Sequence, residues 1–418
     1  MDQSQPAAVT VTPARSPHAV LFIFITVVID MIGLGLIIPV LPEMIRSLSG
    51  TDLADAATIG GWLFFTYGAM QFLCGPLMGN LSDAFGRRRV LLLSVAGLGV
   101  DYLLTALAPT LLWLFIGRAL AGFFGASYTT ANAYIADVTT PKERGKAFGM
   151  IGAAWGIGFV LGPAIGGLLG EFGPRVPFFV AAGLSLVNLA YGYFVLPETL
   201  PPERRRPFDL RRANPLGTLM ALRRVPGVGR LALVVFVFAI GHSVYPAVWA
   251  YFTMYRFGWS EAMVGASLAF FGVMTAIVQG GLTGTIIKRF GERRAAMLGL
   301  TASVLALTGF GAAQAGWVMF AMMVVGCIEG VVMPAVNAMM SQRVPPNAQG
   351  ELQGGISSLQ NIASVTGILA MSQIFGLFAS PAAPIHAPGM PFFVAAVMTA
   401  TALAILVTSV RARRPAEA

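Results

Sequence analysis

The sequence predicts an all-α membrane protein in which twelve transmembrane helices form two pseudo-symmetric six-helix halves. The first observation is composition: 56% of the 418 residues are hydrophobic and 11% are charged, with a mean hydropathy of +0.76. Soluble domains carry about a quarter charged residues. The second observation is a series of apolar runs, each close to the roughly 20 residues that a helix needs to cross a bilayer. The third is a repeat of the first half within the second.

The twelve apolar runs are predicted to be helices, because a helix satisfies its own backbone hydrogen bonds inside lipid. Those of the first half are 20–41, 59–81, 90–108, 110–135, 147–170 and 175–196. Those of the second half are 230–253, 263–286, 294–313, 316–340, 351–377 and 391–410. The first 19 residues, rich in Pro, Ser and Thr, lack a signal-peptide cleavage pattern and are expected to be a cytoplasmic tail.

The basic residues predict how the chain is oriented. The net charge is +9, yet all but four of the 27 Lys and Arg residues lie in the tails and in alternate loops; the exceptions are Arg46, Arg118, Arg175 and Arg256. This asymmetry follows the positive-inside rule and predicts that both termini are cytoplasmic. It also argues against nucleic-acid binding, which needs a basic patch with base-contacting side chains.

Two segments repeat at an offset of 205 residues. "GNLSDAFGRRR" begins at Gly79 and "GTIIKRFGERR" begins at Gly284, and the same offset aligns Asn132 with Asn337. The register holds without a shift over residues 79–149. Such duplication is typical of secondary transporters, which bind substrate near the midplane between the repeats.

The repeat and the charge pattern divide the chain into five parts. An N-terminal half, 20–196, and a C-terminal half, 230–410, flank a linker at 197–229 that is rich in Arg and Pro and has no spanning run. The tails 1–19 and 411–418 complete the chain. The linker and both tails are expected on the cytoplasmic side.

The first repeated loop combines features that topology alone does not explain. A glycine permits close helix approach, an acidic residue precedes the next helix, where the helix dipole favours negative charge, and arginines mark the membrane boundary. We expect these residues to form a gating loop: Gly79, Asp83, Gly86, Arg87 and Arg88. Their arrangement resembles the loop signature of the major facilitator superfamily.

Two further motifs extend that resemblance. "RALAGFFGA" from Arg118 is similar to the fourth-helix motif of the superfamily, with Ala121 in place of its usual Gln. "GMIGAAWGIGFVLGPAIGG" is similar to its antiporter motif in helix five. The glycines of that motif would admit a close neighbouring helix, and its proline removes a backbone hydrogen bond; a purely structural seam is the alternative. The motif residues are Gly149, Gly158, Gly162, Pro163, Gly166 and Gly167.

Within the superfamily the sequence resembles tetracycline-type proton-coupled efflux proteins. The resemblance rests on "DMIGLGLIIPVLP" from Asp30, "DYLLTALAPTLLWLFIGR" from Asp101, "PAVWAYFTMYRFGWSEAMVGASLAFFG" from Pro246 and "GELQGGISSLQN" from Gly350. It departs at two positions: Thr275 replaces the usual His of helix eight, and Ser303 replaces an acidic residue of helix nine.

Charged residues inside the apolar runs are the candidates for proton coupling. A charge at the bilayer centre costs about 2.5 to 3.5 kcal/mol on insertion scales, so such residues are rare unless paired or facing water. Asp101 and Arg118 lie at similar depths of consecutive helices and could form a buried pair. Asp30 is the stronger proton carrier, because the resemblance places its helix at the central cavity, and Glu329 is its rival. The candidates are Asp30, Asp101, Arg118 and Glu329.

Polar and aromatic residues of the same runs are the candidates for substrate binding. Tyr245 and Trp249 are four residues apart, on one helix face, one turn beyond His242. The full set is His242, Tyr245, Trp249, Asn132, Asn337 and Gln360, with Phe64, Phe65 and Trp155 as further aromatic candidates. Each residue alone is also explained by helix packing or an interhelical hydrogen bond.

Taken together, these features favour a proton-coupled antiporter that exports amphipathic, drug-like molecules by alternating access. The expected location is the bacterial inner membrane, and the expected partners are substrate, protons and lipid, with the chain a monomer. The chain lacks a GxxxxGK[ST] string, and Cys74 and Cys327 have no metal-type spacing, so neither ATP-driven transport, nor a cofactor, nor a metal is expected. The alternatives are transport of a physiological metabolite and, more remotely, an intramembrane enzyme; no catalytic residue is predicted.

Overall fold

The computed structural model describes residues 17–126, 128–209, 228–345 and 348–411, which contain helices and loops but no strand. The N-terminal half consists of α1 (Pro17–Ser49), α2 (Leu53–Phe85), α3 (Arg87–Leu107), α4 (Leu111–Gly125), α5 (Tyr128–Val138), α6 (Pro141–Gly170) and α7 (Val176–Val195). The C-terminal half consists of α9 (Gly229–His242), α10 (Val244–Phe257), α11 (Glu261–Ile277), α12 (Thr283–Ala312), α13 (Gly316–Gly326), α14 (Val332–Ser341), α15 (Gln349–Ala379) and α16 (Met390–Arg411).

Three short turns complete the elements. A 3₁₀ turn, η1 (Pro202–Arg204), lies in the linker. A π-helical turn, η3 (Val278–Leu282), joins α11 to α12, and a 3₁₀ turn, η4 (Cys327–Val331), joins α13 to α14. Residues 1–16, 210–227 and 412–418, which include most of the predicted tails and linker, lie outside the described residues.

The helices are consistent with twelve membrane crossings. Ten stretches of the described residues are long and apolar enough to span a bilayer. One of them, Glu261–Ala312, has 52 residues, enough for two crossings, and it is interrupted at Gly291. Helix α2, with 33 residues, is not among these ten but is long enough to cross a bilayer. The prediction of an all-α, multi-pass membrane protein is confirmed.

The helices extend beyond the apolar runs that predicted them. The run 20–41 is part of α1, which ends at Ser49, and the run 59–81 lies within α2, which covers Leu53–Phe85. An apolar run marks the hydrocarbon core, whereas the backbone helix continues into the polar interface. Internal breaks were also not predicted: the run 230–253 is divided at Ser243, and the run 316–340 contains η4.

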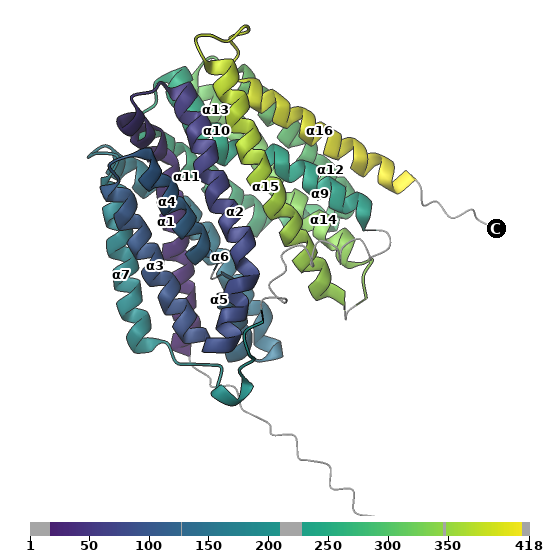
Figure 1. Ribbon diagram of the computed structural model, residues 1–418. Coiled ribbons are helices and arrows are strands. Elements are labelled where there is room, and N and C mark those ends of the chain that lie inside the picture. The colour runs from purple at the N-terminus through teal and green to yellow at the C-terminus, as the bar shows by residue number, and fades with distance from the viewer. Residues whose placement is uncertain (1–16, 127, 210–227, 346–347, 412–418) are drawn as a thin grey trace, which may run out of the picture.

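The two halves meet at one end of the molecule and diverge at the other (Figure 1). Helix α6 packs on α1 of its own half and on α11 of the other, while α2 packs on α15. At the closed end, Gln373 Nε2 donates a hydrogen bond to the carbonyl of Thr58 at 3.2 Å, and the Ala262 amide donates to Glu171 Oε1 at 3.3 Å. The open end carries the loop at Gly86 and the first part of the linker, residues 197–209.

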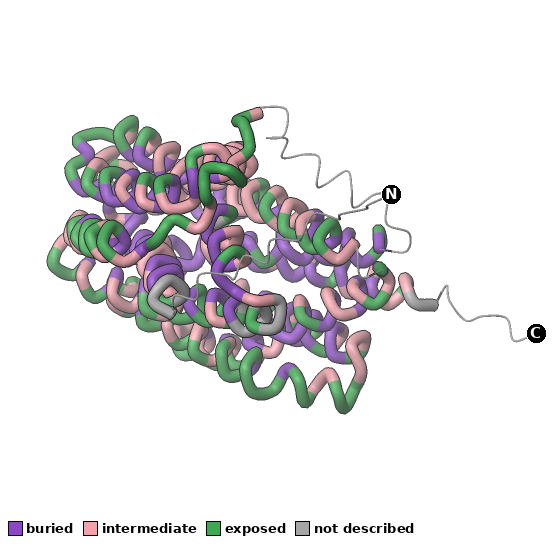
Figure 2. The backbone as a smooth tube through the Cα atoms, turned by 90° about the horizontal axis from the view of Figure 1, so that it is seen from below, coloured by how far each residue is buried: buried purple, intermediate pink, exposed green. Residues whose placement is uncertain are grey.

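Exposed apolar side chains surround the bundle. Buried stretches run through the interior and exposed ones follow the rim when the tube is seen from below (Figure 2). Leu186, Phe194, Trp317 and Val397 each expose between 60% and 83% of their surface. Large exposed apolar side chains of this kind are expected on helices that span a membrane.

Gly86 and Gly291, which align at the 205-residue offset, share an unusual backbone conformation. Their φ angles are 101° and 77°, in the region that side chains rarely adopt. Gly86 separates α2 from α3, and Gly291 interrupts α12 at the corresponding position. The repeated sequence motif therefore corresponds to a repeated reversal of the chain.

Candidate substrate cavity

A cavity of about 580 Å³ lies in the part of the bundle near the open end. Its walls come mainly from α1 to α6, and one face of α15 supplies the only lining side chains from the C-terminal half among the described residues. Its polar lining residues are Thr26, Asp30, Tyr67, Gln71, Tyr102, Arg118, Thr129, Ser357, Ser358, Gln360 and Asn361. The remaining lining residues are apolar, except for Trp155.

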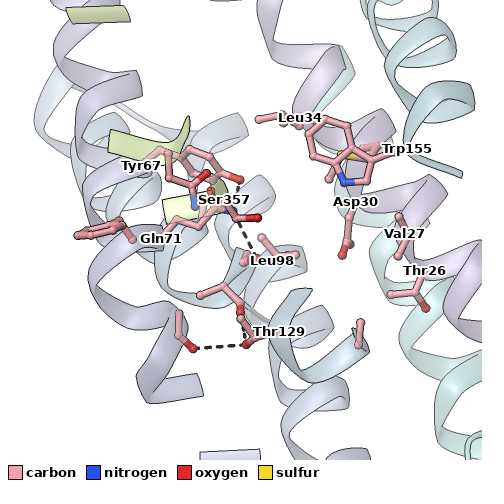
Figure 3. Close-up of a pocket in the computed structure, with 18 of the residues that line it drawn as sticks. Thr26, Val27, Asp30, Leu34, Tyr67, Gln71, Leu98, Thr129, Trp155 and Ser357 are labelled. Carbon is pink, nitrogen blue, oxygen red and sulfur yellow. Dashed lines mark hydrogen bonds between the residues drawn. The ribbon is translucent and has the colours of Figure 1, made fainter. Parts of the chain in front are cut away.

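Two groups of side chains face each other across this cavity (Figure 3). On one side, Asp30 of α1 lies next to the ring of Trp155 of α6, which is 41% exposed. On the other side lie Tyr67, Gln71 and Ser357. Gln71 Nε2 donates a hydrogen bond to the Tyr67 hydroxyl at 3.1 Å. No hydrogen bond or ion pair of Asp30 occurs among the described residues, so its carboxyl group is available to a ligand or a proton.

The predicted pair of Asp101 and Arg118 is present. Arg118 Nη2 donates to Asp101 Oδ2 at 3.0 Å, and Thr105 Oγ1 donates to Asp101 Oδ1 at 3.5 Å. The Asp101 side chain is fully buried and that of Arg118 is 6% exposed. Gly117 makes room for this pair, because a Cβ at that position would lie 2.8 Å from Asp101 Oδ1. In this conformation the guanidinium group of Arg118 is bonded to Asp101, although Arg118 also lines the cavity.

Five of the six substrate-binding candidates lie outside the cavity lining, and three of these five, His242, Tyr245 and Trp249, are neighbours in the C-terminal half. Tyr245 and Trp249 are 7% and 2% exposed and belong to an aromatic cluster with Phe271 and Phe310. Trp249 Nε1 donates to Ser267 Oγ at 2.9 Å, which satisfies its only donor. His242 contacts Tyr245 with ring centroids 5.0 Å apart. Their spacing of three and four residues did bring these side chains together, but Tyr245 and Trp249 lie in the packed interior of the C-terminal half, and only His242 remains exposed.

Glu329 and His242 form a second polar contact in that half. Glu329 Oε1 lies 3.4 Å from His242 Nε2, and Ser303 Oγ donates to Glu329 Oε2 at 2.6 Å. Neither Glu329 nor His242 lines the cavity. The four candidates for proton coupling are therefore divided between two places: Asp30 and Arg118 line the cavity, with Asp101 bound to Arg118 behind it, and Glu329 lies apart from the cavity.

Of the remaining polar candidates, only Gln360 lines the cavity. Asn132 on α5 and Asn337 on α14 each have a buried amide oxygen without a hydrogen-bond partner among the described residues. Because these two asparagines occupy equivalent positions of the repeat, the unpaired oxygens are a shared feature of both halves.

The predicted gating loop is held by a network of ion pairs and hydrogen bonds. Arg87 Nη1 pairs with Asp83 Oδ1 at 2.5 Å, and Arg87 Nε lies 3.4 Å from Asp137 Oδ2. The Arg87 amide donates to Glu198 Oε1 at 2.9 Å, and Arg88 Nη2 donates to the carbonyl of Tyr193 at 2.6 Å. These contacts join the ends of α2, α3, α5 and α7 to the linker. Gly79 has open space beside it, with Thr129 Oγ1 3.8 Å from where a Cβ would lie.

The glycines of the predicted antiporter motif line two close helix contacts. Toward α1, a Cβ at Gly162 would lie 2.8 Å from the Gly35 Cα, and one at Gly166 would lie 2.7 Å from the Leu36 Cα. Gly158 meets Met31 in the same way. Toward α11, Gly167 contacts the backbone of Glu261, and Gly265 contacts the carbonyl of Pro163. Gly149, by contrast, has nothing within 4 Å.

Several lining residues were not candidates from sequence. Tyr67 and Gln71 lie one turn apart on α2, and Ser357 and Asn361 lie one turn apart on α15. The i, i+4 spacing of polar residues inside apolar helices was the available signal. Such uncharged polar residues are common in membrane helices, so they indicate a cavity less specifically than acidic or basic side chains do.

The family model of the Major Facilitator Superfamily matches residues 23–368 and 231–418. The chain belongs to this superfamily. It is 40% identical over 366 residues to the tetracycline resistance protein, class C, of Escherichia coli, covering 88% of this chain and 92% of that protein. The class G protein of Vibrio anguillarum is 39% identical over 354 residues, covering 83% and 88%.

A solved structure shares the fold of this superfamily member. It is a bacterial homologue of the human lysosomal transporter Spinster, in an inward-facing and unoccupied conformation, with a TM-score of 0.77. The alignment covers 96% of this chain and all of that chain at 17% identity, so it bears on the fold alone. Membership of the superfamily confirms the predicted resemblance and identifies the protein as a membrane transporter and not an enzyme.

Proposed function

We propose that this superfamily member is a proton-coupled antiporter that exports amphipathic, drug-like molecules of the tetracycline type. The names of the relatives support drug resistance as the outcome of transport. The cavity supports the substrate class, since 580 Å³ lies within the range of about 300 to 1,000 Å³ that drug-sized ligands occupy, and its walls are mainly apolar. Because Thr275 and Ser303 replace the histidine and the acidic residue of the tetracycline-type proteins, the proposal includes substrates other than tetracycline itself.

Asp30 carries the proposal of proton coupling. It is an ionisable group on the cavity wall with no partner among the described residues, while the nearby cation Arg118 is occupied by Asp101. A carboxylate without a counter-ion is costly inside a membrane, so it binds either a proton or a polar group of the substrate. Competition between the two at one carboxyl group couples proton entry to substrate release.

The remaining assignments follow from this mechanism. The halves 20–196 and 230–410 rotate relative to each other about the cavity. The contact between the glycines of α6 and α11 closes one end of the cavity, and the loop at Asp83 and Arg87 controls the opening of the other end. Tyr67, Gln71, Trp155, Ser357 and Gln360 contact the substrate. We further propose that the open end faces the cytoplasm of a bacterial inner membrane, with both termini on that side, because the basic linker lies there.

The test compares Asp30→Asn with the parent in inside-out membrane vesicles. Proton-driven accumulation of tetracycline is expected to stop, because asparagine keeps the size but does not titrate. Counterflow of labelled tetracycline without a pH gradient is expected to persist. Asp55→Asn, the same change at an exposed position of α2, is the matched control. Normal proton-driven accumulation by Asp30→Asn contradicts the assignment of Asp30.

Substrate range needs a separate measurement. Cells that produce the protein are compared with cells that produce the Asp30→Asn variant in growth assays against tetracyclines and unrelated amphipathic compounds. Protection that depends on Asp30 identifies the exported class. A transporter of a physiological metabolite protects against none of these compounds, and that outcome contradicts drug export.

A further inference from the structure

Three irregular segments of the C-terminal half meet around one buried carboxylate. Glu329 lies in the 3₁₀ turn η4, which packs against the π-helical turn η3. Its contact His242 ends α9, directly before the interruption at Ser243. Non-helical backbone at membrane depth is tolerated only where protein or water surrounds it, and π-helical turns are frequent at functional sites. Irregular backbone and ionisable side chains therefore coincide here.

The carboxylate of Glu329 is only partly satisfied. Oε2 accepts a hydrogen bond from Ser303 at 2.6 Å, but Oε1 has no hydrogen-bond partner among the described residues and faces His242 Nε2 at 3.4 Å. The neighbouring hydroxyl of Tyr245 is likewise buried and lies beside the same carboxylate. The cluster thus combines a buried acid, a base and a phenol hydroxyl, with one carboxylate oxygen that can bind a further proton.

Exposure determines which ligand fits this cluster. The Glu329 side chain is 4% exposed and Tyr245 is 7% exposed, so a molecule the size of a drug has no access to the carboxylate. The His242 side chain is 47% exposed. A proton can reach the imidazole and pass to Glu329 Oε1 across the 3.4 Å contact, whereas an organic cation cannot follow it.

We propose that His242 and Glu329, with Ser303 as a positioning residue, form a second proton-binding site, in the half of the protein opposite Asp30. The neutral cluster holds either an imidazolium with a carboxylate or an imidazole with a carboxylic acid. Loss of the shared proton leaves a neutral imidazole and a carboxylate, with net charge −1. Gain of a proton gives an imidazolium and a carboxylic acid, with net charge +1.

Other charged groups do not compensate these changes. The elements that pack against η4 are α11, η3, α12, α13 and α14. Their described charged residues are Glu261 at one end of α11 and a group at the open end of α12 that includes Glu292, Arg293 and Arg294. Helix α9, which carries His242, packs against α10, α14, α15 and α16. The charged residues of α9 and of these helices lie near helix ends and are Arg230, Arg256, Glu351 and Arg411. At the depth of Glu329 the titratable neighbours are His242, Tyr245 and Cys327. An uncompensated charge is costly in a membrane, so the proton moves when the surroundings of the pair change.

This inference rests on proton exchange as proposed above, and it makes that exchange a two-site process. The experiment counts protons directly. Purified full-length protein in lipid nanodiscs is titrated in weakly buffered solution between about pH 5 and about pH 9, a range that brackets the ordinary titration of imidazole. The double variant His242→Gln/Glu329→Gln is expected to release at least one proton fewer per molecule than the parent.

Two controls make the count specific. Glu351→Gln removes an exposed carboxylate of the same half and is expected to match the parent. Asp30→Asn separates this inference from the proposed function: if it releases as many protons as the parent, the role of Asp30 fails, while the double variant still tests the second site. If the double variant does not fold, Ser303→Ala is titrated instead; it is expected to keep the number of protons and to shift the pH at which they leave.

A double variant that folds and releases as many protons as the parent overturns the inference, because the pair would then be a fixed structural contact. If the double variant does not fold, an unchanged titration curve for Ser303→Ala overturns the inference in the same way.

Discussion

Gly167→Ala perturbs the contact that holds the two halves together at the closed end. Gly167 of α6 lies against the backbone of α11, and a Cβ at this position would meet the carbonyl group of Glu261, 3.0 Å from its carbon, and would lie 3.1 Å from the Ala262 Cα. Backbone atoms cannot rotate away as a flexible side chain can, so α6 and α11 must separate. The hydrogen bond from the Ala262 amide to Glu171 lies at the same contact and would be stretched.

The expected magnitude follows from the cost of overpacking. Inserting one methyl group into a packed interface costs about 1 to 3 kcal/mol. This cost applies only while the two helices are in contact, so it raises the free energy of the state in which this end is closed relative to a state in which the helices part. A difference of about 1 to 3 kcal/mol changes the ratio of the two states by about 5-fold to 150-fold.

Distances between spin labels at Thr110 and Ile385 measure this ratio. Both residues are exposed on loops at the closed end, one in each half, and the native Cys74 and Cys327 are first replaced by alanine. Gly167→Ala is expected to increase the long-distance population. Gly156→Ala on the same helix is the matched control, because nothing lies within 4 Å of its added Cβ. A distance distribution for Gly167→Ala equal to that of Gly156→Ala refutes the reasoning.

Two further predictions concern the ion pairs. Asp101→Leu or Arg118→Met alone should lower the free energy of unfolding by about 3 to 5 kcal/mol, since each leaves a buried charge unpaired. The double variant should recover most of this loss. Thermal unfolding in detergent measures all three variants, and an additive loss in the double variant excludes a buried pair. Asp83→Asn or Arg87→Ala should block tetracycline transport but leave tetracycline binding intact, because the loop lies outside the cavity. If binding is lost in parallel with transport, the loop is needed for folding instead.

The fold was predictable because each of its sequence signals extends over many residues. An apolar run of about 20 residues records the thickness of the membrane, and the 205-residue offset relates the two halves without any knowledge of their contacts. The interruptions at Ser243 and in η4 have a signal in the sequence that the apolar runs do not record: Pro246 follows His242 by four residues, and Pro334 follows Gly330 by four. A proline removes the backbone hydrogen bond to the residue four positions before it. Pro76 and Pro163 nevertheless lie inside continuous helices, so a proline alone does not determine where a helix breaks.

The cavity was predictable only in part, because the direction of a side chain depends on the rotation of its helix. Asp30 and Gln360 line the cavity, while Trp249, which belongs to an equally suggestive pattern, is buried among aromatic rings of its own half. A spacing of four residues shows that Tyr245 and Trp249 share a face, but it does not show which neighbour that face meets. That information is carried by the packing of α10 on α11 and α15.

Glu329 illustrates how a pair of ionisable side chains can be hidden when the sequence is compared position by position. At position 303, where the resemblance to efflux proteins leads one to expect an acidic side chain, the hydroxyl of Ser303 donates to a carboxylate that comes from η4 instead. Thr275, which stands where a histidine is expected, lies beside the same turn, with its methyl carbon 3.6 Å from where a Cβ of Gly330 would lie. His242 supplies an imidazole from α9. An acid and a histidine are thus present at this place in the C-terminal half, but each is contributed by a different helix, so only the folded structure reveals them as a pair.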